Sequence, residues 1–251
     1  EEDADLIHRL LASGETVRVR YTLGCKTLPD AESENVLAEI RGRELPDEIV
    51  VIGGHLDSWD LGTGAIDDGT GCAAVMETIR LLKSLGQRPR RTVRAVLFAN
   101  EENGLRGGKA YADAHRAELD RHIVAIESDS GGGRPIGFGL NAGPGGVEML
   151  SRIAAPLAAI GAADVTGDGG GADISPMQSA RVPMAGLRQE TTHYFDYHHT
   201  AADTLDKVEP KDLEACAAAL AVVAYGLADA ARPLPRPPAL DEKPAEPKPA
   251  K

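Results

Sequence analysis

The sequence has no excess of basic residues, and this absence argues against a nucleic-acid partner. Its 27 lysines and arginines are outnumbered by 39 aspartates and glutamates, which gives a formal net charge of −12. Binding to phosphates requires a basic face, and no segment of the chain supplies one. Clustered carboxylates can instead bind a cation, with a solvated acidic surface as the simpler alternative.

Long apolar runs are also absent, so we expect no membrane-spanning segment. The opening residues, EEDADLIHRL, lack the basic and apolar stretches of a signal peptide. Only three cysteines are present, and none of them belongs to a C-x-x-C motif. We interpret Cys25, Cys72 and Cys216 as small buried residues, with a bridge from Cys25 in an exported protein as the alternative.

What is present is an alternation of helix-like and strand-like segments in a chain of 251 residues, long enough for one large domain. Apolar periodicity predicts helices at about 3–13, 72–86, 107–119, 146–160 and 211–231, and strands within 16–23, 34–42, 48–54, 92–100, 122–129 and 182–187. This order predicts an α/β fold, a three-layer α/β/α sandwich with a mixed, largely parallel central sheet. The first two strands are expected to pair antiparallel at its edge.

We expect one domain over residues 1–231 and a disordered tail over residues 232–251. The tail contains seven of the sixteen prolines and almost no large apolar residue. Such a segment cannot bury enough surface to offset the entropy lost on ordering.

Polar clusters follow three of the predicted strands at the point where each strand ends. IVVIGG is followed by HLDSWDLGTGAIDDGTG, TVRAVLFAN by EEN, and HIVAIE by SDSGGG. The carboxyl ends of parallel strands meet at one edge of a sheet, where ligands bind. We therefore expect a single cluster there, made of His55, Asp57, Asp67, Glu101, Glu102 and Asp129.

Such a cluster calls for a cation, because carboxylates at close quarters repel one another. Imidazole and carboxylate ligands without a thiolate suit zinc or a neighbouring first-row metal better than magnesium or calcium. The ligands outnumber those of one tetrahedral site, which favours two metals with a shared carboxylate. Taken singly, each motif could be an ordinary turn, helix cap or loop. Their occurrence at successive strand ends favours the metal site.

Several long segments together resemble the zinc exopeptidases that use two co-catalytic metals. They are GGHLDSWDLGTGAIDDGTG, FANEENGLRGG, ESDSGGG, GGGADISPM and YHHTAADTLDKV, in family order over roughly residues 15–230. They are most similar to the plasma glutamate carboxypeptidase type. The resemblance implies the three-layer fold, two Zn²⁺ per chain and short peptide substrates. It also implies that this chain is the C-terminal portion of a longer, exported protein.

The resemblance assigns a metal role to five residues. It implies that His55 and Asp129 bind different metals and that Asp67 bridges the two. Glu102 would bind one metal and His199 the other. A metal pair of this kind lowers the pKa of a shared water, which then acts as the nucleophile.

Two acidic residues are expected to support this chemistry without binding metal. Glu101, beside Glu102, would accept the proton of the attacking water and deliver it to the leaving amine. Asp57 would orient the imidazole of His55, as metal-bound histidines generally require.

The adjacent histidines of YHHTAADT are expected to differ in role, because neighbouring side chains of an extended chain point to opposite faces. His199, directly before Thr200, matches the ligand position of the family. His198 takes the place of a tyrosine that polarises the scissile carbonyl in related enzymes. It is therefore the candidate oxyanion donor, with a packed histidine as the alternative. The resemblance also implies a cis peptide between Asp67 and Asp68.

Two residues are candidates for holding the substrate. Asp173, in the segment VTGDGGGADISPM, could bind a free α-amino group or belong to a plain glycine-rich turn. Arg188 could bind a C-terminal carboxylate bidentately. We predict an aminopeptidase or dipeptidase acting on short peptides, with a carboxypeptidase as the alternative.

Two alternatives come from other classes of protein. A receptor-like binding module that has lost its metal ligands is disfavoured because all five presumptive ligands and Glu101 are present. A single-zinc glutaminyl cyclase of the same fold is disfavoured because it would not require His55. The oligomeric state is open, with a homodimer as one option.

Overall fold

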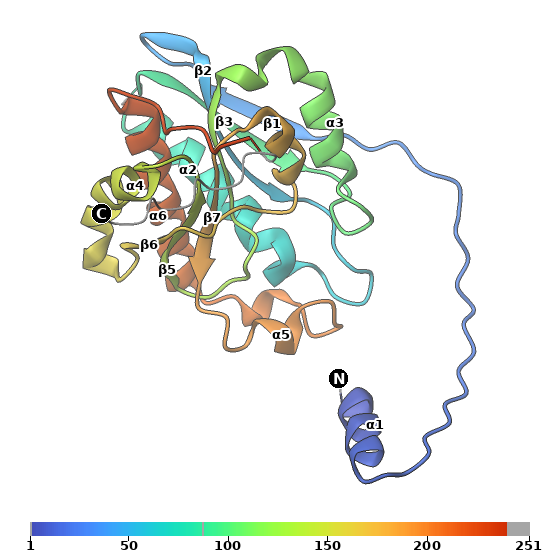
Figure 1. Ribbon diagram of the computed structural model, residues 1–251. Coiled ribbons are helices and arrows are strands. Elements are labelled where there is room, and N and C mark those ends of the chain that lie inside the picture. Colours follow the sequence, from blue (N-terminus) through green and yellow to red (C-terminus); the bar gives the residue numbers. More distant parts are fainter. Residues whose placement is uncertain (1, 87, 240–251) are drawn as a thin grey trace, which may run out of the picture. The chain divides into compact units, whose positions relative to one another are not determined.

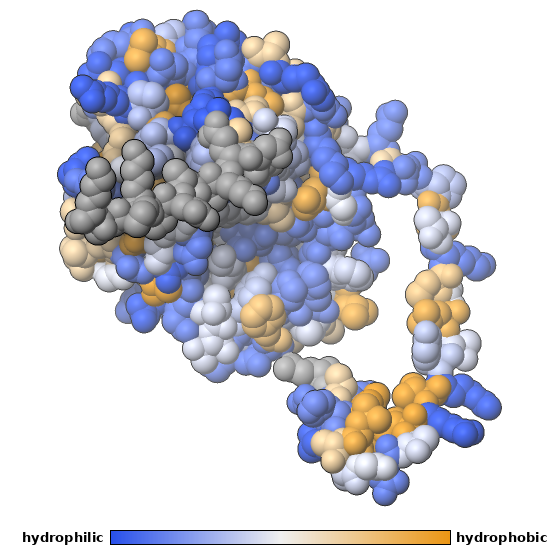
Figure 2. All heavy atoms as spheres, viewed as in Figure 1, coloured by the Kyte–Doolittle hydropathy of each residue, from blue (hydrophilic) through white to orange (hydrophobic). Residues whose placement is uncertain are grey.

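The computed structural model describes residues 2–86 and 88–239, which fall into two units that meet between Glu32 and Ser33 along the chain. The first unit holds helix α1 (Glu2–Ala12), so the helix predicted at 3–13 is confirmed. Leu6 and Leu11 of α1 are exposed, and Figure 2 shows apolar side chains gathered on this helix.

The strand predicted at 16–23 is wrong, because these residues form no regular element. Val19 and Tyr21, whose alternation suggested a half-buried face, are both exposed. Alternation alone does not make a strand, since a strand needs a neighbour that completes its backbone hydrogen bonds. Cys25 is exposed, contrary to our interpretation, whereas Cys72 and Cys216 are buried as predicted.

The second unit is built on a seven-stranded sheet with the order β1-β3-β2-β4-β7-β5-β6 (Figure 1). The strands β3, β2, β4 and β7 are parallel, and so are β5 and β6, whereas β1 pairs antiparallel with β3 and β5 with β7. The mixed, largely parallel sheet is therefore confirmed. The strand bounds are β1 Val36–Ile40, β2 Leu45–His55, β3 Arg91–Phe98, β4 His122–Glu127, β5 Pro135–Asn141, β6 Asp164–Thr166 and β7 Met184–Gln189.

Two of these strands, β5 and β6, were not predicted. β5 reads PIGFGLN, in which glycines interrupt the apolar pattern, and β6 has only three residues. The second predicted strand does form an antiparallel edge, but its partner is β3 rather than the segment at 16–23.

Helices cover both faces of the sheet, which confirms the three-layer arrangement (Figure 1). Alternate residues of β2 show the division: Val50 and Ile52 pack with the helices α2, α4 and α6, and Val51 packs with α3 on the other face. The helix bounds are α2 Thr70–Ser84, α3 Arg106–Ala114, α4 Gly146–Ala154, α5 Tyr194–Tyr197 and α6 Pro210–Asp229, with shorter helical turns η1 Ala65–Gly69, η2 Arg116–Arg121, η3 Ala155–Ile160, η4 Ser175–Ala180 and η5 Leu205–Lys207.

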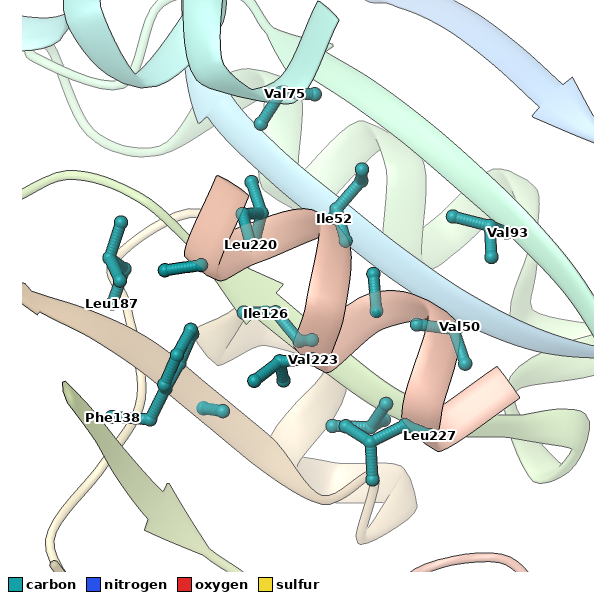
Figure 3. Packing of buried hydrophobic residues seen from close by; sticks show 14 of the residues in the cluster. Val50, Ile52, Val75, Val93, Ile126, Phe138, Leu187, Leu220, Val223 and Leu227 are labelled. Atoms are coloured by element: carbon teal, nitrogen blue, oxygen red, sulfur yellow. The ribbon is translucent and has the colours of Figure 1, made fainter. Parts of the chain in front are cut away.

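Helix α6 provides much of the larger core. Leu220, Val223 and Leu227 recur at helical spacing and face Ile52 and Ile126 of the sheet (Figure 3). Burying each of these side chains contributes about 1.5–3 kcal/mol. This packing holds the strands whose carboxyl ends carry the polar clusters.

The predicted disordered tail is wrong for residues 232–239. Leu234 is buried in the core, and Arg236 donates hydrogen bonds of 2.6–3.0 Å to the backbone carbonyl oxygens of Leu119, Asp120, His122 and Ala180. The carbonyl oxygens of Pro235 and Pro237 also accept hydrogen bonds, from Gly143 N–H at 2.7 Å and Arg181 Nε at 2.8 Å, so this segment is fixed despite its prolines. Residues 240–251 of the predicted tail lie outside the described residues. Within the described ranges, no helix is long and apolar enough to cross a bilayer.

Candidate metal centre

The parallel strands deliver the predicted polar residues to one edge of the sheet, as expected. β2 ends at His55, β3 ends shortly before Glu101 and Glu102, and β4 ends shortly before Asp129. Because Gly53 of β2 pairs with Glu127 of β4, His55 and Asp129 lie at equivalent positions on neighbouring strands.

Asp67 lies at the middle of the cluster. Its Oδ1 atom is 3.2 Å from Nε2 of His55, and its Oδ2 atom is 3.3 Å from Nε2 of His199 and 3.4 Å from Nε2 of His198. The cis peptide between Asp67 and Asp68 that the resemblance implied is present. A carboxylate with imidazoles on both sides is in the position of a bridging ligand.

The remaining ligands fall into two halves around Asp67. Nε2 of His55 is 3.6 Å from Oδ1 of Asp129, and Nε2 of His199 is 3.0 Å from Oε2 of Glu102. The prediction put His55 and Asp129 on different metals, and Glu102 and His199 likewise, whereas the structure places the two members of each pair together. The pairing of β2 with β4 brings His55 and Asp129 together.

These side chains fit bound zinc. One ligand atom each from His55, Asp67 and Asp129 all lie within 4.8 Å of one another. In the other half, the buried Oε1 atom of Glu102 has no hydrogen-bond partner among the described residues. An orphaned carboxylate oxygen beside an imidazole and a second carboxylate is what a cation would satisfy.

The protonation of His55 also indicates that this cluster favours a cation. Its Nδ1 atom lies 2.9 Å from the backbone carbonyl oxygen of Asp57, so Nδ1–H is the donor there, and Nε2 faces Asp67 and Asp129, where a cation can replace its proton. Burial lowers the pKa of His55, but the hydrogen bonds to Asp129 and Asp67 raise it more. The acids thus favour a positive charge at this point.

Asp57 supports the centre differently from the prediction. Its backbone carbonyl, not its carboxylate, accepts the hydrogen bond from His55, whose Nδ1 is 3.8 Å from the carboxylate. The carboxylate instead accepts from the backbone N–H groups of Glu101 (2.9 Å) and Glu102 (3.2 Å). Asp57 therefore connects the loop after β2 to the loop after β3.

Two further acids, to which no role was assigned from the sequence, fix the backbone of the ligands. Asp68 accepts from the backbone N–H of His55 at 3.0 Å. Asp203 accepts from the backbone N–H groups of Ile66 (2.6 Å) and Asp67 (3.1 Å). Both acids are buried. Their places in AIDDGTG and YHHTAADT, beside predicted ligands, were the available signal.

A cavity of about 370 Å³ opens over the centre. Besides the ligands, Glu101, Tyr194 and His198 line it, and the described lining contains no lysine or arginine. Burial raises the pKa of Glu101, helped by its acidic neighbours. Burial also raises the pKa of Tyr194, so its hydroxyl stays protonated. Tyr194 was missed, although it stands only five residues before His199.

The two histidines do not point to opposite faces. Their rings stack with centroids 3.6 Å apart, and both reach Asp67. The segment is not a strand but a turn after α5, in which His199 has a φ of 59°. Only His199 also contacts Glu102, which distinguishes it as the ligand candidate.

The two predicted substrate anchors lie outside this cavity. Asp173 has no exposed surface, because Glu127 accepts hydrogen bonds from the backbone of Ala172 and Ile174 and draws the loop inward. Burial, together with repulsion from Glu127, raises the pKa of Asp173 to about 8. Arg188 pairs with Asp164 and lines a separate, glycine-rich hollow. Neither prediction is supported by the structure.

Comparison with known proteins identifies the family of this chain. The model for peptidase family M28 matches residues 35–224. The chain belongs to peptidase family M28. It is 38% identical over 235 residues to carboxypeptidase Q of Rattus norvegicus and 37% identical to that of Homo sapiens, covering 94% of this chain and 50% of each relative. The chain thus spans about half the length of the curated relatives it matches.

Several solved structures share the fold. An M28 peptidase precursor from Shewanella amazonensis is 42% identical, with a TM-score of 0.82, over 94% of this chain and 54% of that one. A zinc aminopeptidase from Bacillus subtilis has a TM-score of 0.64 at 24% identity over 76% of this chain and 49% of that one. A glutaminyl cyclase from an Acidobacteriales bacterium has a TM-score of 0.60 at 20% identity over 76% and 72%. The last two similarities concern the fold alone.

Proposed function

We propose that this chain is the catalytic portion of a zinc exopeptidase that removes the N-terminal residue of short peptides, including dipeptides. The lining of the cavity supports this most directly. Asp67, Glu101, Glu102 and Asp129 face it, and its described residues include no lysine or arginine. With zinc bound to the other three acids, Glu101 remains to face a free α-ammonium group, and no lysine or arginine of the described lining pairs with a C-terminal carboxylate.

Two zinc ions would be held with Asp67 shared between them. His55 and Asp129 complete one set of ligands, and Glu102 and His199 complete the other. Zinc bound there would lower the pKa of a water and polarise the scissile carbonyl.

Glu101 serves as the general base and then as the general acid. Its side chain lines the cavity, and Asp57 holds its backbone N–H at 2.9 Å. Burial raises the pKa of Glu101, which suits a carboxylate that must take up a proton near neutral pH. Glu101 accepts the proton of the attacking water and transfers it to the leaving amine.

The developing oxyanion needs a donor from the chain. His198, the predicted donor, lines the cavity with its Nε2 atom 3.4 Å from Asp67. The Tyr194 ring lies 4.8 Å from that of His198 and lines the same cavity. Tyr194 is therefore a second candidate. Both side chains line the cavity beside Asp67, where they could donate a hydrogen bond to the substrate's carbonyl oxygen.

The test combines a substrate panel with one substitution. We expect hydrolysis of aminoacyl anilides and dipeptides, and none of N-acetylated dipeptides, because acetylation removes the ammonium group. Glu101→Gln should lower kcat by 10²–10⁴-fold while about two zinc ions per chain are retained. Glu148→Gln, at an exposed position of α4, is the matched control. Activity that survives Glu101→Gln, or a preference for N-acetylated substrates, would contradict the proposal.

A carboxypeptidase is the second candidate, because the curated relatives are named carboxypeptidase Q. It predicts the reverse result with the substrate panel: N-acetylated dipeptides would be cleaved. A silent binding module is not favoured, since the five predicted ligands and Glu101 lie together. A single-zinc glutaminyl cyclase is not favoured either, since His55 adds to a second set of ligands. Export and a homodimeric state rest on resemblance alone and stay predictions.

A further inference from the structure

The single tryptophan of the chain, Trp59, contacts the metal centre. It lies in the loop between β2 and η1, and its indole Nε1–H donates a 2.7 Å hydrogen bond to Oε2 of Glu102. Its ring also lies against the ring of His199, with centroids 5.1 Å apart and planes at 43°. The indole is 49% exposed, so its burial alone does not explain its position.

This contact fixes one carboxylate oxygen and leaves the other open. Oε2 of Glu102 receives the indole N–H, whereas the buried Oε1 has no hydrogen-bond partner among the described residues. An indole donor carries no charge, so it orients the carboxylate without repelling a cation. A lysine or arginine at the same place would orient it too, but would compete with the metal.

Trp59 contacts only one half of the centre. Its hydrogen bond and its ring contact go to Glu102 and His199, whereas Asp57 orients His55 in the other half. Asp57 also accepts from the backbone N–H of Glu102, so the backbone of Glu102 is held by Asp57 and its side chain by Trp59.

We propose that Trp59 is a positioning residue that sets the zinc affinity of the Glu102–His199 half. The proposal rests on the two-metal function proposed above. Loss of the indole N–H frees the Glu102 carboxylate to rotate, and loss of the ring frees the imidazole of His199. Removing such an outer partner of a metal ligand typically weakens metal binding by about 10–100-fold.

The test is a zinc titration of the metal-free chain against a competing chelator. Trp59→Phe keeps an aromatic ring beside His199 but removes the N–H donor. We expect one of the two zinc ions to bind about 10–100-fold more weakly and the other to bind as before. Leu61→Ala, at an exposed position in the same loop, is the matched control and should leave both affinities unchanged. Unchanged affinities in Trp59→Phe would overturn the proposal.

A second measurement uses the unaltered chain, so it holds even if the variant does not fold. Trp59 is the only tryptophan, and its emission should change on zinc addition and saturate with one of the two ions. Emission that does not respond to saturating zinc would overturn the proposal.

Failure of the proposed function gives a different result. A chain that binds two zinc ions with the Trp59→Phe effect but hydrolyses no peptide would refute the exopeptidase and keep this inference. If the chain hydrolyses peptides and Trp59→Phe leaves the zinc affinities unchanged, the exopeptidase function stands and the role of Trp59 is refuted.

Discussion

The metal centre and the group of side chains around Arg94 differ in how their charges are balanced. In the Arg94 cluster, the guanidinium donates to Glu118 at 2.7 Å, to Glu39 at 2.6 Å and to the hydroxyl of Tyr111 at 2.9 Å. The same hydroxyl lies 2.8 Å from Nε2 of His122. Every acid of that cluster therefore has a cationic partner within the protein.

The metal centre has the same kinds of acid without a lysine or arginine in its described lining. Asp67 and Asp129 lie beside imidazoles, Glu102 lies beside the imidazole of His199 and the indole of Trp59, and Oε1 of Glu102 has no hydrogen bond within the described residues. A buried carboxylate that is neither paired nor protonated is costly. The comparison teaches that charges paired within the protein can be structural, whereas carboxylates gathered with imidazoles beside a cavity mark a candidate functional site.

The largest expected effect comes from removing a ligand. His199→Ala should lose one zinc ion and about 10³-fold in kcat, because a metal supplies several kcal/mol of transition-state stabilisation. His198→Ala, its matched neighbour, should keep both ions and lose about 10²-fold as an oxyanion donor. Zinc content after dialysis and steady-state kinetics separate the two. If His198→Ala lost an ion and His199→Ala kept both, His198 would be the metal ligand and His199 the candidate oxyanion donor.

The Arg94 cluster should respond in stability rather than in metal content. Arg94→Met removes the guanidinium from Glu118, which keeps His115 as a partner, and from the exposed Glu39, and we expect the free energy of unfolding to fall by about 1–3 kcal/mol. Urea unfolding measures this, and zinc affinity should not change. Arg116→Met removes an exposed ion pair with Asp113 and should cost less than about 1 kcal/mol. Equal free energies of unfolding in Arg94→Met and Arg116→Met would contradict a stabilising role for the Arg94 cluster.

The smallest effect concerns pH. Burial lowers the pKa of His122 from 6.5 to about 4, so between these values the unfolded chain binds a proton that the folded chain does not. Stability from neutral His122 is complete above pH 6.5 and is lost as the pH falls toward 4, on the order of 3 kcal/mol in all. Urea unfolding at pH 7.5 and 5.0 should show a smaller change in His122→Asn than in the parent chain. Equal changes would show that His122 titrates normally.

The sequence was sufficient to predict which residues gather, and insufficient to predict how they pair. The positions of His55, Glu102 and Asp129 after successive buried strands placed them at one edge of the sheet. Their division into halves depends on the register of β2 with β4, which no local pattern reveals. The stacking of His198 on His199 likewise follows from a left-handed residue in a turn.

The substrate anchors could not be predicted for a different reason. Asp173 stands in a glycine-rich segment of the kind that usually forms an exposed loop, but Glu127 binds the backbone of that loop from below. A buried acid that organises a loop through its backbone leaves no signature in the loop's own residues. Asp203 and Asp68 act on the ligand loops in the same way.

The C-terminal segment has a practical consequence for anyone who shortens this protein. Because the segment after Ala231 is rich in proline, it could be mistaken for a disordered tail and removed. A cut there would take away Leu234 and the guanidinium of Arg236, and four backbone carbonyls, including that of His122 at the start of β4, would lose their donor. A shortened version should therefore keep Leu234, Arg236 and Pro237, whose carbonyl oxygen accepts a 2.8 Å hydrogen bond from Arg181.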